Sequence, residues 1–223
     1  ANPRVAEALM AKKTAEGRAA HGNPLWLSLA LQEMNLLEAD DYAQADKEYA
    51  HLPGAERILK LQLDQAESLP SDVPGVYGEL LDRAARYCGE EWLSALFGVL
   101  AVSRAGWRES DLRPLVPLVS GRQWDDLAFA QARRILGPHM VQRGAHSQWD
   151  FFHASLRDAL MKRGLEDERA RKDIHRLVCD HFESLPASDP LRIEETMHHL
   201  LRLGDRERAA AHLAAAVYDR SPT

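Results

Sequence analysis

The residues GPHMVQRGAHSQWDFFHASLRDAL, numbered 137–160, decide the fold of this chain. Within them, segments 139–142 and 148–152 flank a polar turn that contains Gly144, and the second segment alternates as a strand does. A helix is expected directly after this hairpin, over 154–163. Since this is the one convincing β signal in the sequence, we expect a mainly α protein that carries a single β-hairpin.

Helical patterns precede the hairpin. The spacing of apolar residues predicts helices at about 76–87, 91–102, 109–119 and 124–136, the last ended by Gly137-Pro138. Several helices that close on one hairpin, with a further helix behind it, have the order of a winged helix. Its core is expected to contain the aromatic residues of this region, which are Trp92, Phe97, Trp124, Phe129, Trp149 and Phe151.

The N-terminal third shows separate helical signals. Asn2-Pro3 and Asn23-Pro24 each combine a capping Asn with a Pro at the first helical position. The first helix is expected to run to about Ala20, and Pro53-Gly54 separates two further short helices. Segment 70–75 is dense in turn formers and is predicted to be a linker.

The C-terminal residues have the pattern of helical hairpins. Amphipathic stripes lie on both sides of a loop bounded by Pro186 and Pro190, and Gly204-Asp205 ends one helix and starts the next. Leu201 is expected on the apolar stripe of the first of these two helices, and Leu213 is expected to face inward from the second. Paired amphipathic helices without a third layer usually continue into a stacked array.

Composition and charge exclude several classes of protein. The chain has 223 residues, with 28 Lys and Arg against 34 Asp and Glu, which gives a formal net charge of −6. That balance argues against a large non-specific surface for nucleic acid, and no apolar run is long enough to span a membrane. Cys88 and Cys179 are too few for a disulfide framework and fit a reducing cytoplasm. Since the chain starts at Ala1 and enters a helix at once, we expect it to be a piece of a longer protein.

The sequence lacks the motifs of catalysis and of metal binding. It has no phosphate-binding loop of the G-x-x-x-x-G-K-[ST] type and no G-x-S-x-G nucleophile. His175, Cys179 and His181 are close in sequence, but on a helix His181 points away from the face that the other two share. We therefore expect no catalytic residue, no metal site and no enzyme activity in the chain by itself.

Four segments, taken in order, resemble signal-transduction ATPases of the STAND class. HGNPLWL (21–27) resembles the N-P-L-Y-L segment in the lid of NACHT and NB-ARC ATPases. SRAGWRESDL (103–112) is similar to the S-R-x-G-L-x-E-x-E-L stretch of their winged helix, and WDFFHASLRDAL (149–160) to the end of that domain. ETMHHLL (195–201) resembles the helices that follow, on the way to C-terminal repeats.

The resemblance implies a division of the chain into regions without the Walker core. Residues 1–69 would be the helical lid subdomain and 70–75 the linker. Residues 76–164 would form the winged-helix domain, and 165–223 the helical hairpins that begin a repeat arm.

The resemblance also implies two contacts with a nucleotide. Pro24 would offer a flat apolar wall to adenine, and His153 would donate to a β-phosphate. Each has a purely structural alternative, since Pro24 can simply start a helix and His153 can pack between hairpin and helix. The chain departs from the family pattern at Trp26 and Trp107, and Ala154 stands where Asp follows His in the M-H-D form.

The function implied is that of a regulatory and oligomerisation module in a STAND switch. It would close over ADP in the resting state and pass activation to C-terminal repeats once ATP replaces ADP. The parent would be a cytoplasmic ATPase that uses ADP, ATP and Mg, while the chain itself would hold no cofactor. Its partners would be the upstream nucleotide-binding core of the same protein and, on activation, further copies of itself; no membrane and no nucleic acid are expected.

The alternative is a winged-helix DNA-binding transcriptional regulator. Such a protein concentrates Lys and Arg on the wing and on the helix before it. Here Arg133-Arg134 share their helix with Asp125 and Asp126, and the wing carries Arg143 with two histidines. The mixed charge favours the switch module.

Overall fold

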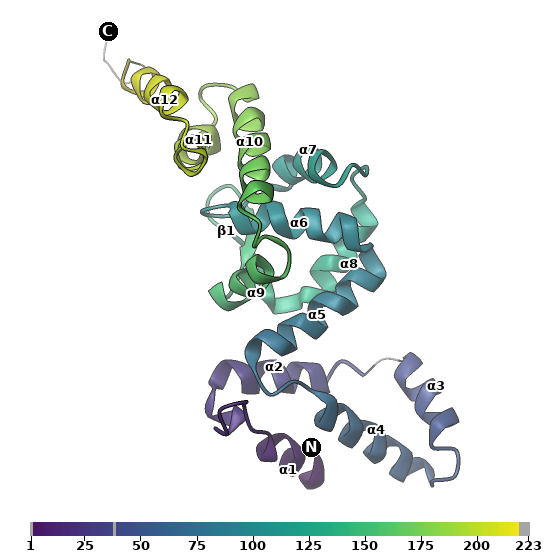
Figure 1. The fold of residues 1–223 in the computed structure, drawn as a ribbon. Coiled ribbons are helices and arrows are strands. Elements are labelled where there is room, and N and C mark those ends of the chain that lie inside the picture. Colours follow the sequence, from purple (N-terminus) through teal and green to yellow (C-terminus); the bar gives the residue numbers. More distant parts are fainter. Residues whose placement is uncertain (1, 38, 219–223) are drawn as a thin grey trace. The chain divides into compact units, whose positions relative to one another are not determined.

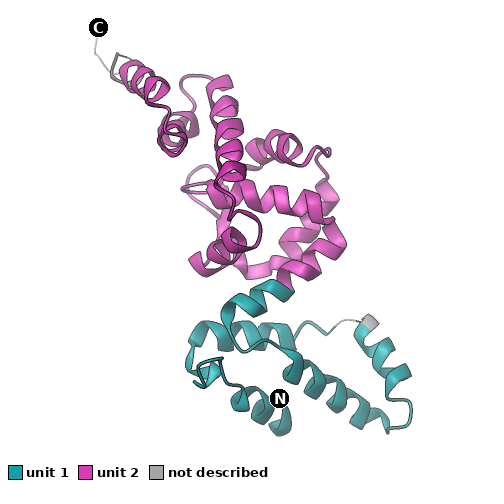
Figure 2. Cartoon of the chain, in the orientation of Figure 1, with its two compact units in different colours: residues 1–79 teal, residues 80–223 magenta. Residues whose placement is uncertain are grey.

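A computed structural model gives the fold and describes residues 2–37 and 39–218. These residues form a mainly helical protein with one small antiparallel hairpin, as predicted (Figure 1). They divide into two compact units, residues 1–79 and residues 80–223 (Figure 2). Residues 219–223, at the end of the predicted repeat arm, lie outside the described residues.

The first unit consists of short helices that follow capping signals. Its elements are α1 (Pro3–Ala11), η1 (Ala20–Gly22), α2 (Pro24–Met34), α3 (Ala39–Glu48), α4 (Gly54–Ser68) and the first turns of α5 (Val73–Cys88). As predicted, the side chains of Asn2 and Asn23 accept hydrogen bonds from backbone N–H groups of the helices that they precede. The buried Trp26 donates from Nε1 to the carbonyl of Pro70 at 2.8 Å and so anchors α2.

Helix α1 ends at Ala11, so the prediction that it runs to about Ala20 is wrong. The alanines of this stretch favour a helix, but Gly17 has a φ of 77° and turns the chain. The backbones of Lys13 and Ala19 then pair across the turn.

Helix α5 begins at Val73, within the segment 70–75 that is predicted to be a linker. The side chain of Asp72 accepts a hydrogen bond from the backbone N–H of Gly75 at 2.7 Å, which starts the helix as a capping residue does. The boundary between the two compact units falls between residues 79 and 80, inside this helix.

The second unit begins with helices that surround the hairpin. Its elements are α6 (Glu90–Val102), α7 (Glu109–Ser120), α8 (Asp126–Leu136), η2 (Gly137–His139), β1 (Met140–Arg143), β2 (Gln148–Phe151) and α9 (Ala154–Gly164). In the hairpin, Met140 pairs with Phe151 and Arg143 pairs with Gln148. Helix α6 lies at the centre of the core, where Leu96 is completely buried. From α6 onward, the predicted ends of these elements agree with the structure within two residues.

Three helices complete the second unit, namely α10 (Glu168–Ser184), α11 (Pro190–Leu203) and α12 (Arg206–Tyr218). Helix α10 packs against α6, α7 and α11, so the predicted helical hairpins belong to the same compact unit as the hairpin region. Cys179, Leu200 and Ala209 form a small core among these helices. Leu201 and Leu213 are 67% and 57% exposed, so the expectation that Leu213 faces inward is wrong.

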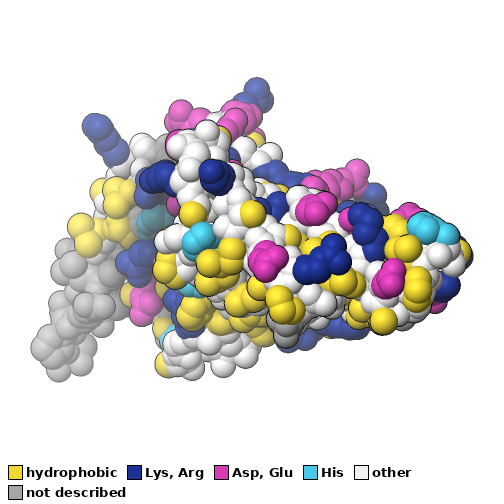
Figure 3. All heavy atoms as spheres, turned by 90° about the horizontal axis from the view of Figure 1, so that it is seen from below, with side chains coloured by type: hydrophobic (Ala, Val, Ile, Leu, Met, Phe, Trp, Pro, Cys, Tyr) yellow, Lys and Arg dark blue, Asp and Glu magenta, His cyan; other side chains and the backbone are white. Residues whose placement is uncertain are grey.

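The surface carries charges of both signs. On the face shown in Figure 3, basic and acidic side chains are interspersed among apolar ones. Of the helices described, none has the length and the apolar character that crossing a bilayer demands.

Candidate functional site

Pro24 lies in the first compact unit, at the first position of α2, and is exposed. Close to it is a cavity of about 560 Å³, lined by Asn23, Trp26 and parts of segments 14–22 and 71–74. Pro24 is not itself among the residues that line this cavity. An exposed proline near a hollow fits an apolar wall for a planar ring, and it also fits the ordinary start of a helix.

His153 lies in the second unit, at the exit of the hairpin, where it is the residue that precedes α9. Its half-buried ring meets the ring of Phe152 edge-on, with 4.6 Å between the centroids. Among the described residues, its ring nitrogens form no hydrogen bond, and its side chain does not cap α9. His139 is buried, and burial, followed by the charge of His153, lowers the pKa of His139.

His153 therefore keeps its donor capacity at the position where the resemblance puts a phosphate contact. Since Pro24 and His153 belong to different compact units, their contact with one nucleotide stays a prediction.

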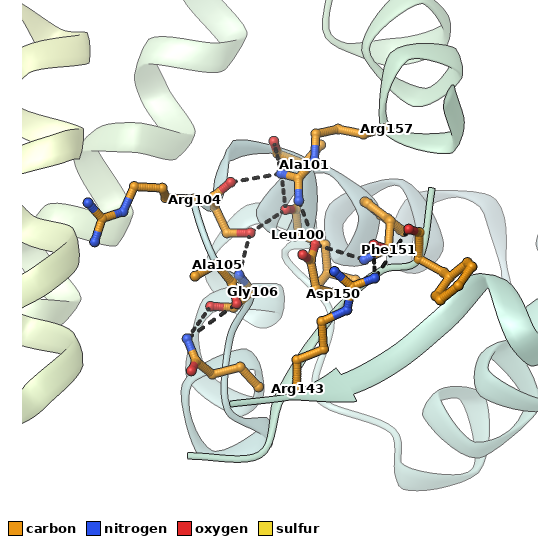
Figure 4. A network of polar contacts seen from close by, with 12 residues as sticks. Leu100, Ala101, Arg104, Ala105, Gly106, Arg143, Asp150, Phe151 and Arg157 are labelled. Atoms are coloured by element: carbon orange, nitrogen blue, oxygen red, sulfur yellow. Dashed lines mark hydrogen bonds and ion pairs between the residues drawn. The ribbon is translucent and has the colours of Figure 1, made fainter. Parts of the chain in front are cut away.

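A network of polar contacts around Arg157 joins the hairpin to the end of α6 (Figure 4). Arg157 donates to the carbonyls of Leu100, Ala101 and Ser103 at 2.7 to 3.1 Å and to the carboxylate of Asp150. The last carbonyls of a helix carry partial negative charge, which makes a guanidinium favourable there. The charge of Arg157 is thus used within the fold, a role that the sequence did not reveal.

The loop after α6 contains the segment SRAGW (103–107), and its contacts explain why these residue types stand there. The hydroxyl of Ser103 donates to the carbonyl of Leu100 and accepts from the N–H of Gly106. Gly106 has a φ of 84°, and a Cβ there would lie 2.3 Å from the carbonyl oxygen of Trp149, so only glycine fits. Trp107 and Trp149 exchange two backbone hydrogen bonds, of 3.1 and 2.8 Å, which tie the loop to the hairpin.

A charged cluster holds α10 and α11 to α7. Arg108 donates to Asp111 at 2.7 and 3.0 Å and to Asp189 at 2.8 and 3.2 Å. His181 points away from His175, as predicted, and its Nε2 lies 3.1 Å from the buried carboxylate of Asp111. Burial raises the pKa of Asp111, but the contacts with His181 and Arg108 outweigh it and hold the pKa below its ordinary value.

Two buried histidines meet between α10 and α11. Nδ1 of His175 and Nδ1 of His199 are 2.6 Å apart, so one ring donates and the other accepts. Glu195 is fully buried, lies 3.7 Å from Nε2 of His199 and accepts a hydrogen bond from the backbone N–H of Arg104. Burial, followed by the charge of His199, lowers the pKa of His175 to about 3.

The sequence did not predict this pair, because spacing along one helix says nothing about a partner on the next. In the part of the chain that the structure describes, no three His, Cys, Asp or Glu side chains are arranged to hold a metal ion.

Comparison of this chain with protein-family models, with curated proteins and with solved structures finds no match.

Proposed function

We propose that this chain is the regulatory and oligomerisation module of a STAND-class switch. In this proposal, the module closes over ADP held by an upstream nucleotide-binding core and passes activation to C-terminal repeats. The observation that carries the proposal is His153, which stands at the exit of the hairpin with no hydrogen bond to its ring nitrogens among the described residues. Because the ring is only half-buried, those nitrogens are free to meet a ligand supplied from outside this chain.

The physical logic is that of a two-state hinge. A ligand shifts such an equilibrium only through contacts that it makes in one state and not in the other. A ring N–H of His153 that reaches a phosphate oxygen only in the closed state supplies such a difference. The exposed faces of Leu201 and Leu213 also support the proposal, because a following repeat would cover them.

The test is an ADP titration of the full-length protein, in the wild type and with His153→Ala. A hydrogen bond to a charged group contributes about 1.5–3 kcal/mol. Its loss should weaken ADP binding by one to two decades, since each 1.4 kcal/mol is tenfold. His146→Ala is the matched control, because His146 is exposed in the turn of the same hairpin.

The folded fraction is measured in parallel for each variant. Equal dissociation constants per folded molecule for wild type and His153→Ala would reject the sensor role and leave His153 as a packing residue.

A further inference from the structure

A cavity of about 680 Å³ lies in the second unit, where α9, α10 and α11 meet the end of α6. Cavities of this size accommodate small-molecule ligands. Its charged lining consists of Arg104, Arg157, Arg171, Lys172 and Arg202 against the single carboxylate of Glu168. Five cationic groups against one carboxylate leave a formal surplus of four positive charges, in a chain whose net charge is −6.

Some of these cations are neutralised within the fold. Arg157 forms its ion pair with Asp150, and Lys172 lies 2.7 Å from Glu168. Arg104 lies 3.5 Å from the buried carboxylate of Glu195. Because these three cations already have carboxylate partners, they are not the groups that would attract an anionic ligand.

Arg171 and Arg202 are different. Arg171 donates to the carbonyl of Leu165 at 3.0 Å, an acceptor without a formal charge, and Arg202 is exposed at the cavity. Neither forms an ion pair with a carboxylate among the described residues. The pKa of His175 is lowered first by burial and by the neighbouring histidines, and then by the charges of Arg202 and Arg171. The positive charge of both arginines therefore acts on a residue that also lines the cavity. The one carboxylate of the lining, Glu168, is shared, because it pairs with Lys172 at 2.7 Å and also feels the charge of Arg171. Arg171 and Arg202 thus face one hollow whose single carboxylate does not balance its cations.

We propose that this cavity binds a small phosphate-bearing anion through Arg171 and Arg202. The guanidinium group is charged at every physiological pH, and its planar fork matches two oxygens of a phosphate. A free phosphate compound and the phosphate arm of a nucleotide share this chemistry. His153 does not line the cavity, so the site is independent of the function proposed above.

The test is calorimetric titration of pyrophosphate into chain 1–223. We expect saturable binding at one site, weakened about tenfold or more by Arg171→Gln and by Arg202→Gln, since each removes a charge-assisted contact. Arg169→Gln is the matched control: Arg169 is exposed on the same helix as Arg171 and does not line the cavity. It removes the same charge and should change the affinity by about twofold at most in physiological salt.

The outcomes separate the two sources of phosphate. ADP binding more tightly than pyrophosphate identifies a nucleotide, and pyrophosphate binding at least as tightly identifies a free phosphate compound. Citrate that binds as tightly as pyrophosphate would overturn the assignment to phosphate. The site is also rejected if millimolar pyrophosphate gives no saturable signal, or if Arg169→Gln weakens binding as much as Arg202→Gln. Because Arg202 is exposed, its variant should fold, which circular dichroism checks.

Discussion

At the scale of single residues, one glycine and one pair of buried histidines depend on contacts with distant parts of the chain. Gly106 lets the loop after α6 approach the backbone of Trp149, which no side chain would permit. His175 and His199 share one hydrogen bond between their Nδ1 atoms in the core, while Nε2 of His199 has no hydrogen-bond partner among the described residues. Gly106 belongs to the segment SRAGW (103–107), which is visible in the sequence. The reason that this position must be glycine is the carbonyl of Trp149, 43 positions later. The histidine partner lies 24 positions away on another helix, beyond the reach of helical periodicity.

Gly106→Ala should destabilise the protein strongly. The new Cβ would meet the carbonyl oxygen of Trp149, and alanine rarely adopts a φ of 84°. We expect the free energy of unfolding to fall by about 2–4 kcal/mol, measured by urea denaturation. Gly164→Ala is the control, because its Cβ would meet nothing within 4 Å and its effect should stay within about 1 kcal/mol. Equal urea midpoints for the two variants would contradict the close approach.

The stability of the protein should depend on pH through His175. Its pKa in the folded chain is about 3, below the ordinary value of 6.5, so the unfolded chain binds a proton that the folded chain does not. The stability that this neutral ring confers is complete above pH 6.5 and is lost as the pH falls toward 3. The slope is about 1.4 kcal/mol per pH unit, or about 2 kcal/mol between pH 6.5 and 5.

His175→Asn should remove this share of the slope, because asparagine is polar but does not titrate. The measurement is the free energy of unfolding across that pH range, with His146→Asn as an exposed control. An unchanged slope in His175→Asn would show that the ring is not held neutral.

At the scale of elements, local sequence signals determine where helices and strands begin and end, and long-range contacts determine how these elements attach to one another. Caps and apolar spacing are local, which is why the sequence predicts helices α6 to α9 and the hairpin to within two residues. The early end of α1 escapes such reasoning, because the chain becomes extended at Lys12 and then turns at Gly17 so that Lys13 pairs with Ala19. The sequence also does not show how the elements attach to one another, because Arg157 and Arg108 bind partners that are far away along the chain.

Arg108→Ala should loosen the attachment of α10 and α11 to α7. It would leave the buried carboxylate of Asp111 and the nearby Asp189 without their shared guanidinium. Removing one partner of a buried pair costs about 3–5 kcal/mol, and we expect the lower end because His181 remains beside Asp111.

Hydrogen exchange should show faster opening of the amides of α10 and α11, and urea denaturation should show the loss of stability. Arg113→Ala is the control, because its pairs with Glu109 and Asp126 are largely exposed and contribute about 0.5 kcal/mol. If the amides of α10 and α11 exchange at the same rate in both variants, Arg108 is not what attaches these helices.

At the scale of the whole molecule, sequence and structure contribute differently to the candidate site. The sequence predicted where Pro24 and His153 would lie, at a helix start and at the exit of a hairpin, and both are there. It did not predict the cationic cavity, because the cavity's charges are spread over residues 104–202 and meet only through the packing of α9, α10 and α11.

The whole-molecule charge predicts weak binding to duplex DNA. The net charge is −6, and the helix before the hairpin, α8, carries Asp126 in its first turn. The guanidinium of Arg133 lies 4.8 Å from the ring centre of Phe129 and 5.0 Å from that of Trp149, and Arg143 donates to the carbonyls of Phe151 and Phe152. These contacts hold the two guanidinium groups in the hairpin region without neutralising them, so we expect weak binding chiefly because acidic residues outnumber basic ones in the chain.

Fluorescence anisotropy with a labelled duplex of about 20 base pairs should therefore give a dissociation constant weaker than about 10 μM at physiological salt. Arg143→Gln should leave that constant unchanged within about twofold, because the guanidinium of Arg143 contacts the hairpin's own carbonyls. A sub-micromolar complex that weakens steeply with salt, and weakens further in Arg143→Gln, would favour the DNA-binding regulator. It would mean that the wing exchanges its internal contacts for phosphates, since a fixed Arg143 cannot serve both.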